Sequence, residues 1–329
     1  MSSDLPVALI FFARPDLLRQ TFSAIKQNKP KQLFLIQDGP RNDKPDDIIK
    51  IQKCRDIVEH IDWECEVYRN YSDVNLGCGK RVSTGVTWAF TYVDRLAIIE
   101  DDCVPSKGFF PFCSELLELY KDDLRIHMIC GMNNLGIYEE TPYDYFFSES
   151  GSIWGWATWK RVWDKVDFNL EVISDTYACK LLEAKYGKKL LADSVSMRKK
   201  INSNILISSW SLQKGISAYL YSGLNIVPKS NLITNIGLGA EGTNSVSSIK
   251  MIHRGLRRIY FMPTYTVTLP LKHPFYVISD VIYTRKINKV MGSSNLFLRR
   301  YRWLESILYR LINLDQRLIN RVTKLFYLK

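Results

Sequence analysis

The chain of 329 residues has no Cys-x-x-Cys pair, no internal repeat and no low-complexity tract. Its seven cysteines are scattered singly, which excludes the usual zinc spacings and is typical of a reducing compartment. No apolar run reaches the ~20 residues that a membrane-spanning helix needs. The apolar run 7–12 has no basic flank before it, so we expect a first strand there and not a signal peptide.

Hydrophobic residues make up 46% of the chain and aromatic residues 12%, a composition typical of a folded protein. Positive charge is concentrated after residue 249. Residues 250–329 contain 16 Lys and Arg against three acidic residues, a net charge of +13, and the rest of the chain carries −2. This asymmetry indicates contact with a polyanion or an anionic membrane surface, and a solvated basic face is the alternative.

Strand-like and helix-like segments alternate through the first half of the chain. We expect strands over 6–12, 32–37, 65–69, 96–99 and 127–130, and helices over 16–27, 45–60, 80–92 and 109–119, the last capped by Ser106. This alternation predicts an α/β fold whose mainly parallel sheet has helices on both faces.

Two of the expected strands end in carboxylates. The strand 96–99 runs directly into Glu100, Asp101 and Asp102, and the strand 32–37 into Asp38. Ligands of open α/β sheets bind at the carboxyl ends of the strands. Three adjacent acids are costly unless a cation shares them, so we expect Mn²⁺ or Mg²⁺ to bridge Asp102 to a diphosphate. Glu100 and Asp101 would serve ribose, sugar hydroxyls or metal-bound water.

A glycine-containing turn precedes the helix expected at 80–92. It reads Asn75-Leu-Gly-Cys-Gly-Lys-Arg81. Gly77 and Gly79 permit close approach of a backbone, and Lys80 and Arg81 could meet phosphate at the helix N-terminus. The turn lies between the two acid-ended strands, so we expect one crevice to include all three features.

Six short motifs occur in a fixed order: RP at 14–15, DGPR at 38–41, NLGCG at 75–79, EDDCVP at 100–105, WGWATW at 154–159 and NLITNIG at 231–237. The set resembles bacterial nucleotide-diphospho-sugar glycosyltransferases of the GT-A fold. The acidic triplet also resembles that of the N-acetylglucosaminyltransferase I group. The resemblance spans about residues 6–243.

This resemblance implies a GT-A domain over 1–249, with a nucleotide-sugar half at 1–132 and an acceptor half at 133–249. The charge distribution marks off residues 250–329 as a separate basic helical region. It implies that Asp102 holds the metal, and that Arg14, Asp38, Asn75, Gly77, Arg81 and Glu100 lie around the nucleotide. Trp154, Trp156 and Trp159 would form the wall where the sugars meet, although Trp is also a common core residue.

The chain departs from these relatives at one important point. They often carry Trp-Asp where this chain has Trp210-Ser211, and serine cannot deprotonate an acceptor hydroxyl at neutral pH. Glu149 and Glu241 are the other candidate bases, beside Asp101 and Asp102 as the catalytic carboxylates. Retention of configuration or loss of activity are the alternatives.

Beyond residue 170, we expect a mostly polar helix over 176–200 and extended, turn-rich structure over 205–236. Residues 296–328 have apolar residues at three- and four-residue steps with arginines between them, which predicts a basic amphipathic helix. Such a helix can lie in a membrane interface, and packing on the protein's own core or on a second subunit is the alternative.

The sequence thus predicts a metal-dependent glycosyltransferase that uses a nucleotide-diphosphate sugar. The basic C-terminal region favours a lipid-diphosphate-linked glycan acceptor at the cytoplasmic face of the membrane, as in assembly of O-antigen or capsule. A nucleotidyltransferase and a non-catalytic module that binds membrane or polyanion are the rival hypotheses. No zinc-finger spacing or aromatic-basic repeat supports nucleic-acid binding.

Deleting residues 293–329 tests the membrane hypothesis. We expect the full chain to bind anionic liposomes with an affinity that falls as salt rises, because its arginines interact with lipid head groups. The truncated chain should lose most of this binding in a liposome sedimentation assay. Equal binding by both chains would contradict the hypothesis.

Overall fold

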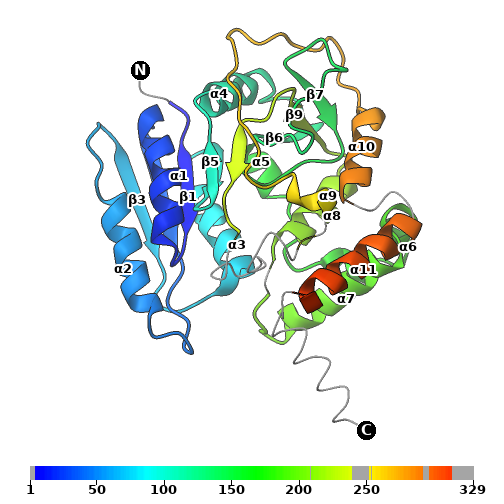
Figure 1. Cartoon of the computed structure of the whole chain (residues 1–329), viewed down its shortest axis with the longest axis horizontal. Helices are drawn as coiled ribbons and strands as arrows, with labels where there is room; N and C mark the ends of the chain where they lie inside the picture. The colour runs from blue at the N-terminus through cyan, green and yellow to red at the C-terminus, as the bar shows by residue number, and fades with distance from the viewer. Residues whose placement is uncertain (1–3, 208, 239–251, 253, 292–295, 313–329) are drawn as a thin grey trace.

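The computed structural model describes residues 4–207, 209–238, 252, 254–291 and 296–312 (Figure 1). Its centre is an eight-stranded sheet with the strand order β3-β2-β1-β4-β8-β6-β9-β7. In the described part of the chain, four of the seven neighbouring strand pairs are parallel, among them the three within β3-β2-β1-β4. The predicted α/β class is confirmed, with a Rossmann-like first half.

The elements of the first half alternate as the sequence predicts. They are β1 (Val7–Phe11), α1 (Pro15–Asn28), β2 (Gln32–Gln37), α2 (Asp47–Val58), β3 (Glu66–Tyr71), α3 (Gly77–Ala89), β4 (Arg95–Glu100), β5 (Cys103–Pro105), α4 (Phe109–Leu119) and β6 (Ile126–Cys130).

The later elements are shorter and more mixed. They are β7 (Tyr145–Ser148), β8 (Trp156–Trp159), α5 (Lys160–Trp163), the 3-10 turn η1 (Glu171–Ser174), α6 (Thr176–Tyr186), α7 (Lys188–Asn202), α8 (Ser211–Leu220), β9 (Leu224–Pro228), β10 (Ile233–Asn235), α9 (Arg254–Arg257), α10 (Val281–Met291) and α11 (Leu296–Ile312).

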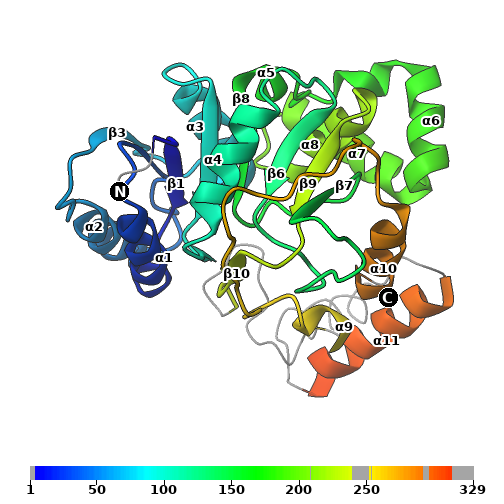
Figure 2. The same ribbon diagram turned by 90° about the horizontal axis from the view of Figure 1, so that it is seen from above.

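Alternating side chains along the inner strands divide the core into two layers. In β1, Val7 and Leu9 pack on one side of the sheet with residues of α1, α2 and α4, while Ala8 and Ile10 pack on the other with residues of α3 and α10. Figure 2 shows α1 and α2 on one side of β1 and α3 on the other. Both faces of a parallel sheet must be covered in this way, since its strands are apolar on both sides.

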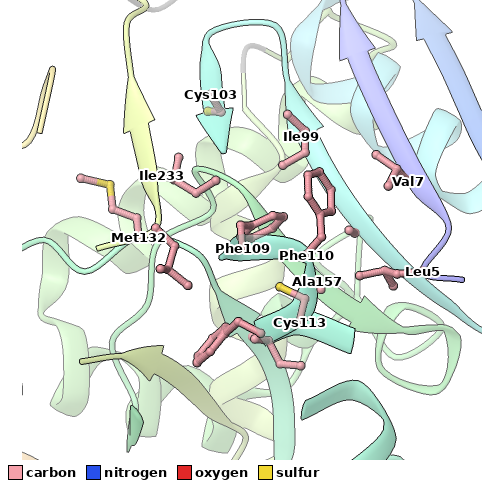
Figure 3. Close-up of a cluster of buried hydrophobic side chains, with 14 of the residues drawn as sticks. Leu5, Val7, Ile99, Cys103, Phe109, Phe110, Cys113, Met132, Ala157 and Ile233 are labelled. Carbon is pink, nitrogen blue, oxygen red and sulfur yellow. The ribbon is translucent and has the colours of Figure 1, made fainter. Parts of the chain in front are cut away.

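Hydrophobic side chains of α4 pack against both halves of the chain. Phe109 and Phe110 of α4 pack against Ile99 of β4 and Ile233 of β10 (Figure 3). The short strands β5 and β10 pair antiparallel beside the main sheet. This contact brings the segment 233–237 to the end of β4, where the three acids lie.

Several local predictions are wrong for physical reasons. Helix α8 lies inside the segment expected to be extended; it is only ten residues long and has Gly215 in its interior, which weakens the helical signal. The helix expected at 176–200 is broken at Gly187, where φ is +86°. Ser106 is not a side-chain cap: α4 starts at Phe109, whose N–H donates to the Ser106 carbonyl.

Strands β7, β8 and β9 continue the same sheet, and α10 from the basic region packs on it. Tyr283 and Ile287 of α10 are buried, and the Tyr138 hydroxyl donates to Asp280 at 2.9 Å.

Of the amphipathic helix expected over 296–328, α11 accounts for Leu296–Ile312, and the remainder lies outside the described residues. Helix α11 lies beside α9 and α10 (Figure 2). The Arg302 guanidinium donates to the Val290 carbonyl, and the Arg257 guanidinium lies 4.6 Å from the centre of the Tyr309 ring.

His127 of β6 is a buried titratable group in this core. It is 4% exposed, and a Cβ on Gly223 would lie 2.1 Å from its Nδ1. Burial lowers its pKa to about 4, and Lys214, Arg161 and Lys165 add to the shift. The neutral imidazole is therefore the form that this packing accommodates.

We expect the stability of the protein to fall as pH drops from about 6.5 to about 4, because the unfolded chain then binds a proton that native His127 does not. Urea midpoints measured across this range for the wild type and for His127→Gln will check it. The variant should lack this component of the pH dependence. The same slope in both proteins would contradict the assignment.

Candidate functional site

The predicted crevice exists at the carboxyl edge of the parallel strands. Strands β2 and β4 flank β1 in the sheet and run parallel to it. Asp38 and Glu100 therefore lie on either side of the carboxyl end of β1. Together with Asp101 and Asp102 they line a cavity of about 460 Å³. The prediction that the two acid-ended strands meet at one cleft is confirmed.

Arg14, directly after β1, provides the positive charge for this cluster. Its Nε and Nη2 donate to the two oxygens of Asp101, and its Nη1 donates to Asp102 Oδ2 at 2.8 Å. The N–H of Phe12 also donates to Asp101 Oδ2 at 3.2 Å. Asp101 is 2% exposed, so these contacts give it the role of holding Arg14 and the end of β1. The sequence predicts Asp101 among the catalytic carboxylates, whereas in the structure its oxygens are engaged with Arg14.

The protonation of the cluster reflects burial and crowding. Burial raises the pKa of Glu100 to about 8, with further contributions from Asp102 and Asp101. Burial also raises the pKa of Asp101, against the attraction of Arg14. Burial alone would lower the pKa of Arg14, but the two aspartates outweigh it and raise that pKa. No hydrogen bond from a described residue reaches the Glu100 carboxylate, which leaves it available to a ligand.

Asp102 is fixed by the β5–β10 ladder. The N–H of Ile236 donates to its carbonyl at 2.9 Å, and the Asn235 amide lies 3.4 Å from its Oδ1. A Cβ on Gly237 would lie 2.0 Å from Asp102 Oδ2. Only glycine at this position leaves the carboxylate where it is, which explains the last residue of the 231–237 motif.

Asp38 holds the start of α3. Its Oδ1 accepts the N–H groups of Gly39 and Leu76, at 3.0 and 2.8 Å, and its Oδ2 accepts that of Gly77 at 2.9 Å. Burial raises its pKa, and these donors oppose the shift. Asn75 adds a bond to the Gly39 carbonyl at 2.8 Å. Both side chains thus shape the loop that borders the cleft.

The glycine turn at 77–79 serves packing in the structure. Gly77 has φ +73° and lines the cleft. Gly79 lies against the Ile207 carbonyl oxygen, and a Cβ on Gly79 would be only 2.6 Å from that oxygen. The sequence predicts that this glycine makes room for a phosphate, whereas in the structure it makes room for the backbone of residue 207. Arg81 also lines the cleft and donates to Asn70, but its buried Nε has no described partner.

The predicted tryptophan wall is only partly correct. Trp156 and Trp159 are 0% and 5% exposed in β8, so neither offers a face to a sugar. The reason is that β8 lies between β4 and β6 inside the sheet. Trp154 is half-buried, lines the cleft and packs on Tyr260 with ring centroids 5.0 Å apart. Tyr260 also lines the cleft, although no local motif predicts it as a site residue.

The end of the cleft around Ser211, where the sequence predicts the acceptor, has no free acid among the described residues. Ser211 lines it, with its Oγ 2.8 Å from that of Ser209. The four described carboxylates of the lining all lie at the strand ends. Glu149 lines an adjoining cavity and pairs with Lys185, and Glu241 lies outside the described residues.

Comparisons with known proteins add the following. No family model matches the chain, and no curated protein matches its sequence. The solved structures similar to it include a UTP-bound UGPase from Acinetobacter baumannii, with a TM-score of 0.37 and 9% identity over 70% of this chain and 88% of the other. A UDP-glucose pyrophosphorylase complexed with UDP-glucose has a TM-score of 0.32 and 9% identity, over 69% and 91%.

The residues present suit a divalent ion that is shared with a ligand. No group of three His, Cys, Asp or Glu among the described residues could hold a metal without help. Mg²⁺ and Mn²⁺ sites often need only one or two carboxylates, with phosphate oxygens and water completing the shell. Asp102 could supply one oxygen, and the unpartnered Glu100 lies beside it.

Replacing Arg14 by Ala should lower the free energy of unfolding by roughly 3 kcal/mol, since the aspartates stay buried without a counter-charge. Millimolar Mn²⁺ should then raise the melting temperature of this variant more than that of the wild type. Thermal and urea unfolding provide the measurement.

Arg19→Ala is the matched control, because Arg19 is 67% exposed and lies 3.6 Å from Asp16. It should change stability by less than about 0.5 kcal/mol. A similar loss in both variants, or no differential response to Mn²⁺, would show that Arg14 does not balance the acids.

Proposed function

We propose that this protein is a divalent-cation-dependent glycosyltransferase of the GT-A type, which moves a sugar from a nucleotide-diphosphate sugar to a glycan acceptor. One observation carries the proposal: the three carboxylates at the carboxyl end of β4 gather with Arg14 in a cleft at the carboxyl edge of a Rossmann-like sheet. Open α/β sheets bind nucleotides at this edge, and a cation linking acids to a diphosphate accounts for the charge pattern.

Each donor-side residue has a distinct task in this proposal. Arg14 presents a planar guanidinium, which suits phosphate oxygens, and Asp101 orients it. Asp102 would hold the ion, and Glu100 would accept hydrogen bonds from ribose or sugar hydroxyls. When bound, the ion offsets negative charge on the leaving diphosphate. Asp38 keeps the 75–77 loop at the border of the nucleotide site.

The acceptor side would be formed by Trp154 and Tyr260 around Ser211. An aromatic face suits the C–H surface of a sugar, and Trp154 is the member of the tryptophan cluster placed for it. Deprotonation of an acceptor hydroxyl needs a base, for which Glu149 and Glu241 stay the candidates. Glu149 lies next to the cleft but is engaged with Lys185.

Nucleotidyl transfer is the rival that product analysis separates. The β1–α1 connection, where such enzymes usually carry a glycine-rich phosphate loop, consists of Phe12, Ala13 and Arg14. Release of a nucleoside diphosphate indicates glycosyl transfer, whereas release of pyrophosphate indicates nucleotidyl transfer. A chain that binds nucleotides but releases neither product would be a non-catalytic relative.

Helix α11 supports the proposed contact with a membrane surface. Phe297, Tyr301, Leu304 and Leu308 recur on one face of the helix and are 81%, 54%, 58% and 55% exposed. The apolar stripe therefore does not pack on the described part of the protein's own core. No described helix is long and apolar enough to cross a bilayer. An interfacial helix next to a lipid-linked acceptor accounts for both facts.

Replacing Asp102 by Asn should abolish Mn²⁺-dependent hydrolysis of nucleotide sugars while the protein stays folded, since the amide loses the charge and keeps the shape. A panel of nucleotide sugars followed by phosphate NMR or chromatography will measure this, with circular dichroism to check the fold. Full activity in a folded variant would contradict the metal assignment.

Gly237→Ala tests the same carboxylate without changing it. The added methyl group displaces Asp102, so the Mn²⁺-dependent thermal shift with nucleoside diphosphates should shrink or vanish. Gly215→Ala in α8 is the control, because a Cβ there meets nothing within 4 Å. It should leave the thermal shift unchanged. An undiminished shift in Gly237→Ala would argue against Asp102 as the ion ligand.

A further inference from the structure

A second and larger cavity adjoins the proposed donor cleft. It measures about 720 Å³, within the range of small-molecule sites. Residues of β6, β9, α8 and α10 line it together with the segment 149–154. Ile153, Trp154 and Ser211 line both cavities, so the two spaces meet where the acceptor hydroxyl must reach the donor sugar.

Lys214 of α8 lines this second cavity without a counter-charge. The residue is 7% exposed, and its Nζ contacts the sulfur of Met128 at 3.2 Å and the ring of Trp156 at 5.0 Å. No described carboxylate pairs with it. A thioether is a weak acceptor, so the ammonium is poorly compensated, and burial lowers its pKa to about 8.

Asn225 of β9 provides a second unsatisfied group in the same cavity. Its Nδ2 donates to the Glu149 carbonyl at 3.0 Å, which orients the amide. Its Oδ1 is buried and has no described hydrogen-bond partner. Two residues of one cavity lining, Lys214 and Asn225, therefore each carry a buried polar group that the described residues leave poorly satisfied. Unpaired buried polar groups cost stability, so their presence in a ligand-sized space indicates that a ligand supplies the partners.

We propose that this cavity binds the glycan acceptor of the transfer reaction, and that the acceptor carries an oxyanion, a carboxylate or a phosphate, that pairs with Lys214 Nζ. The inference rests on the proposed glycosyl transfer and names its acceptor class as an acidic glycan. Asn225 Oδ1 accepts a hydrogen bond from a sugar hydroxyl, and Trp154 and Tyr219 supply aromatic surface for the rings.

The charges around the cavity agree with an anionic ligand. Glu149 is the one acid in the described lining, and its carboxylate is paired with Lys185, so it does not neutralise Lys214. Lys214 is the one described lysine or arginine of that lining. A charge-assisted hydrogen bond in a largely buried site selects strongly for an oxyanion over a neutral hydroxyl.

The test compares glucuronic acid and glucose 6-phosphate with glucose, using the full chain and ligand-observed NMR titration. The wild type should bind at least one acidic sugar about tenfold more tightly than glucose. The sugar with the larger preference shows whether the oxyanion is a carboxylate or a phosphate. Equal affinity for all three sugars would overturn the proposal.

Two substitutions assign the preference to one atom. Lys214→Met should remove it and raise the melting temperature, because a well-packed apolar side chain replaces an unpaired ammonium. Lys214→Arg should keep part of the preference. Lys189→Met, at a lysine 83% exposed on α7, should leave it unchanged. If Lys214→Met still prefers acidic sugars over glucose, whatever its melting temperature, Lys214 has only a structural role and the proposal is overturned.

A parallel measurement separates this inference from the proposed function. The thermal shift with nucleoside diphosphate and Mn²⁺ reports the donor cleft alone and should be equal in the wild type and in Lys214→Met. If that shift is absent while the acid preference depends on Lys214, the oxyanion site stands and its assignment to an acceptor is overturned. If the shift is present and no acid preference exists, the inference fails and the donor site stands.

Discussion

The cleft depends on the pairing of Arg14 with Asp101 and Asp102. Three carboxylates at the end of one buried strand repel one another, and a guanidinium at the end of the neighbouring strand is the cation that makes the arrangement stable. Because β1 and β4 are adjacent and parallel, their carboxyl ends bring the two groups together. The fold thus presents an internal ion pair in the lining of the cleft.

Several segments distant in the sequence fix the position of the Asp102 carboxylate. The β5–β10 ladder fixes its backbone, Asn235 lies at one oxygen, and the missing side chain of Gly237 leaves room for the other. By contrast, the end of the cleft around Ser211 carries no free acid among the described residues. The chain therefore combines a tightly built acidic cluster with an adjoining cavity whose distinctive charge is Lys214.

The first half of the fold follows from local patterns. Apolar runs ending in Asp38 and Glu100 mark two strands, and the helices between them require parallel pairing, which places both acids at one edge. The elements of the second half are harder to predict from local sequence patterns. Helix α8 is only ten residues long and contains Gly215, which disfavours a helix interior, so it is hard to distinguish from the turn-rich sequence around it. Trp156 and Trp159 look like a sugar-binding cluster, yet β8 is inserted between β4 and β6 and buries both.

The amino-acid sequence alone determined the α/β class, the two acid-ended strands and the basic amphipathic segment, because each depends on neighbours within a few residues. Only the tertiary structure decided which cation balances the acids, which tryptophan faces the cleft and where Lys214 lies. These depend on contacts between segments 80 or more residues apart, such as Arg14 with Asp101 and Lys214 with Met128. Spacing along a chain carries no information about such partners until the strand order is known.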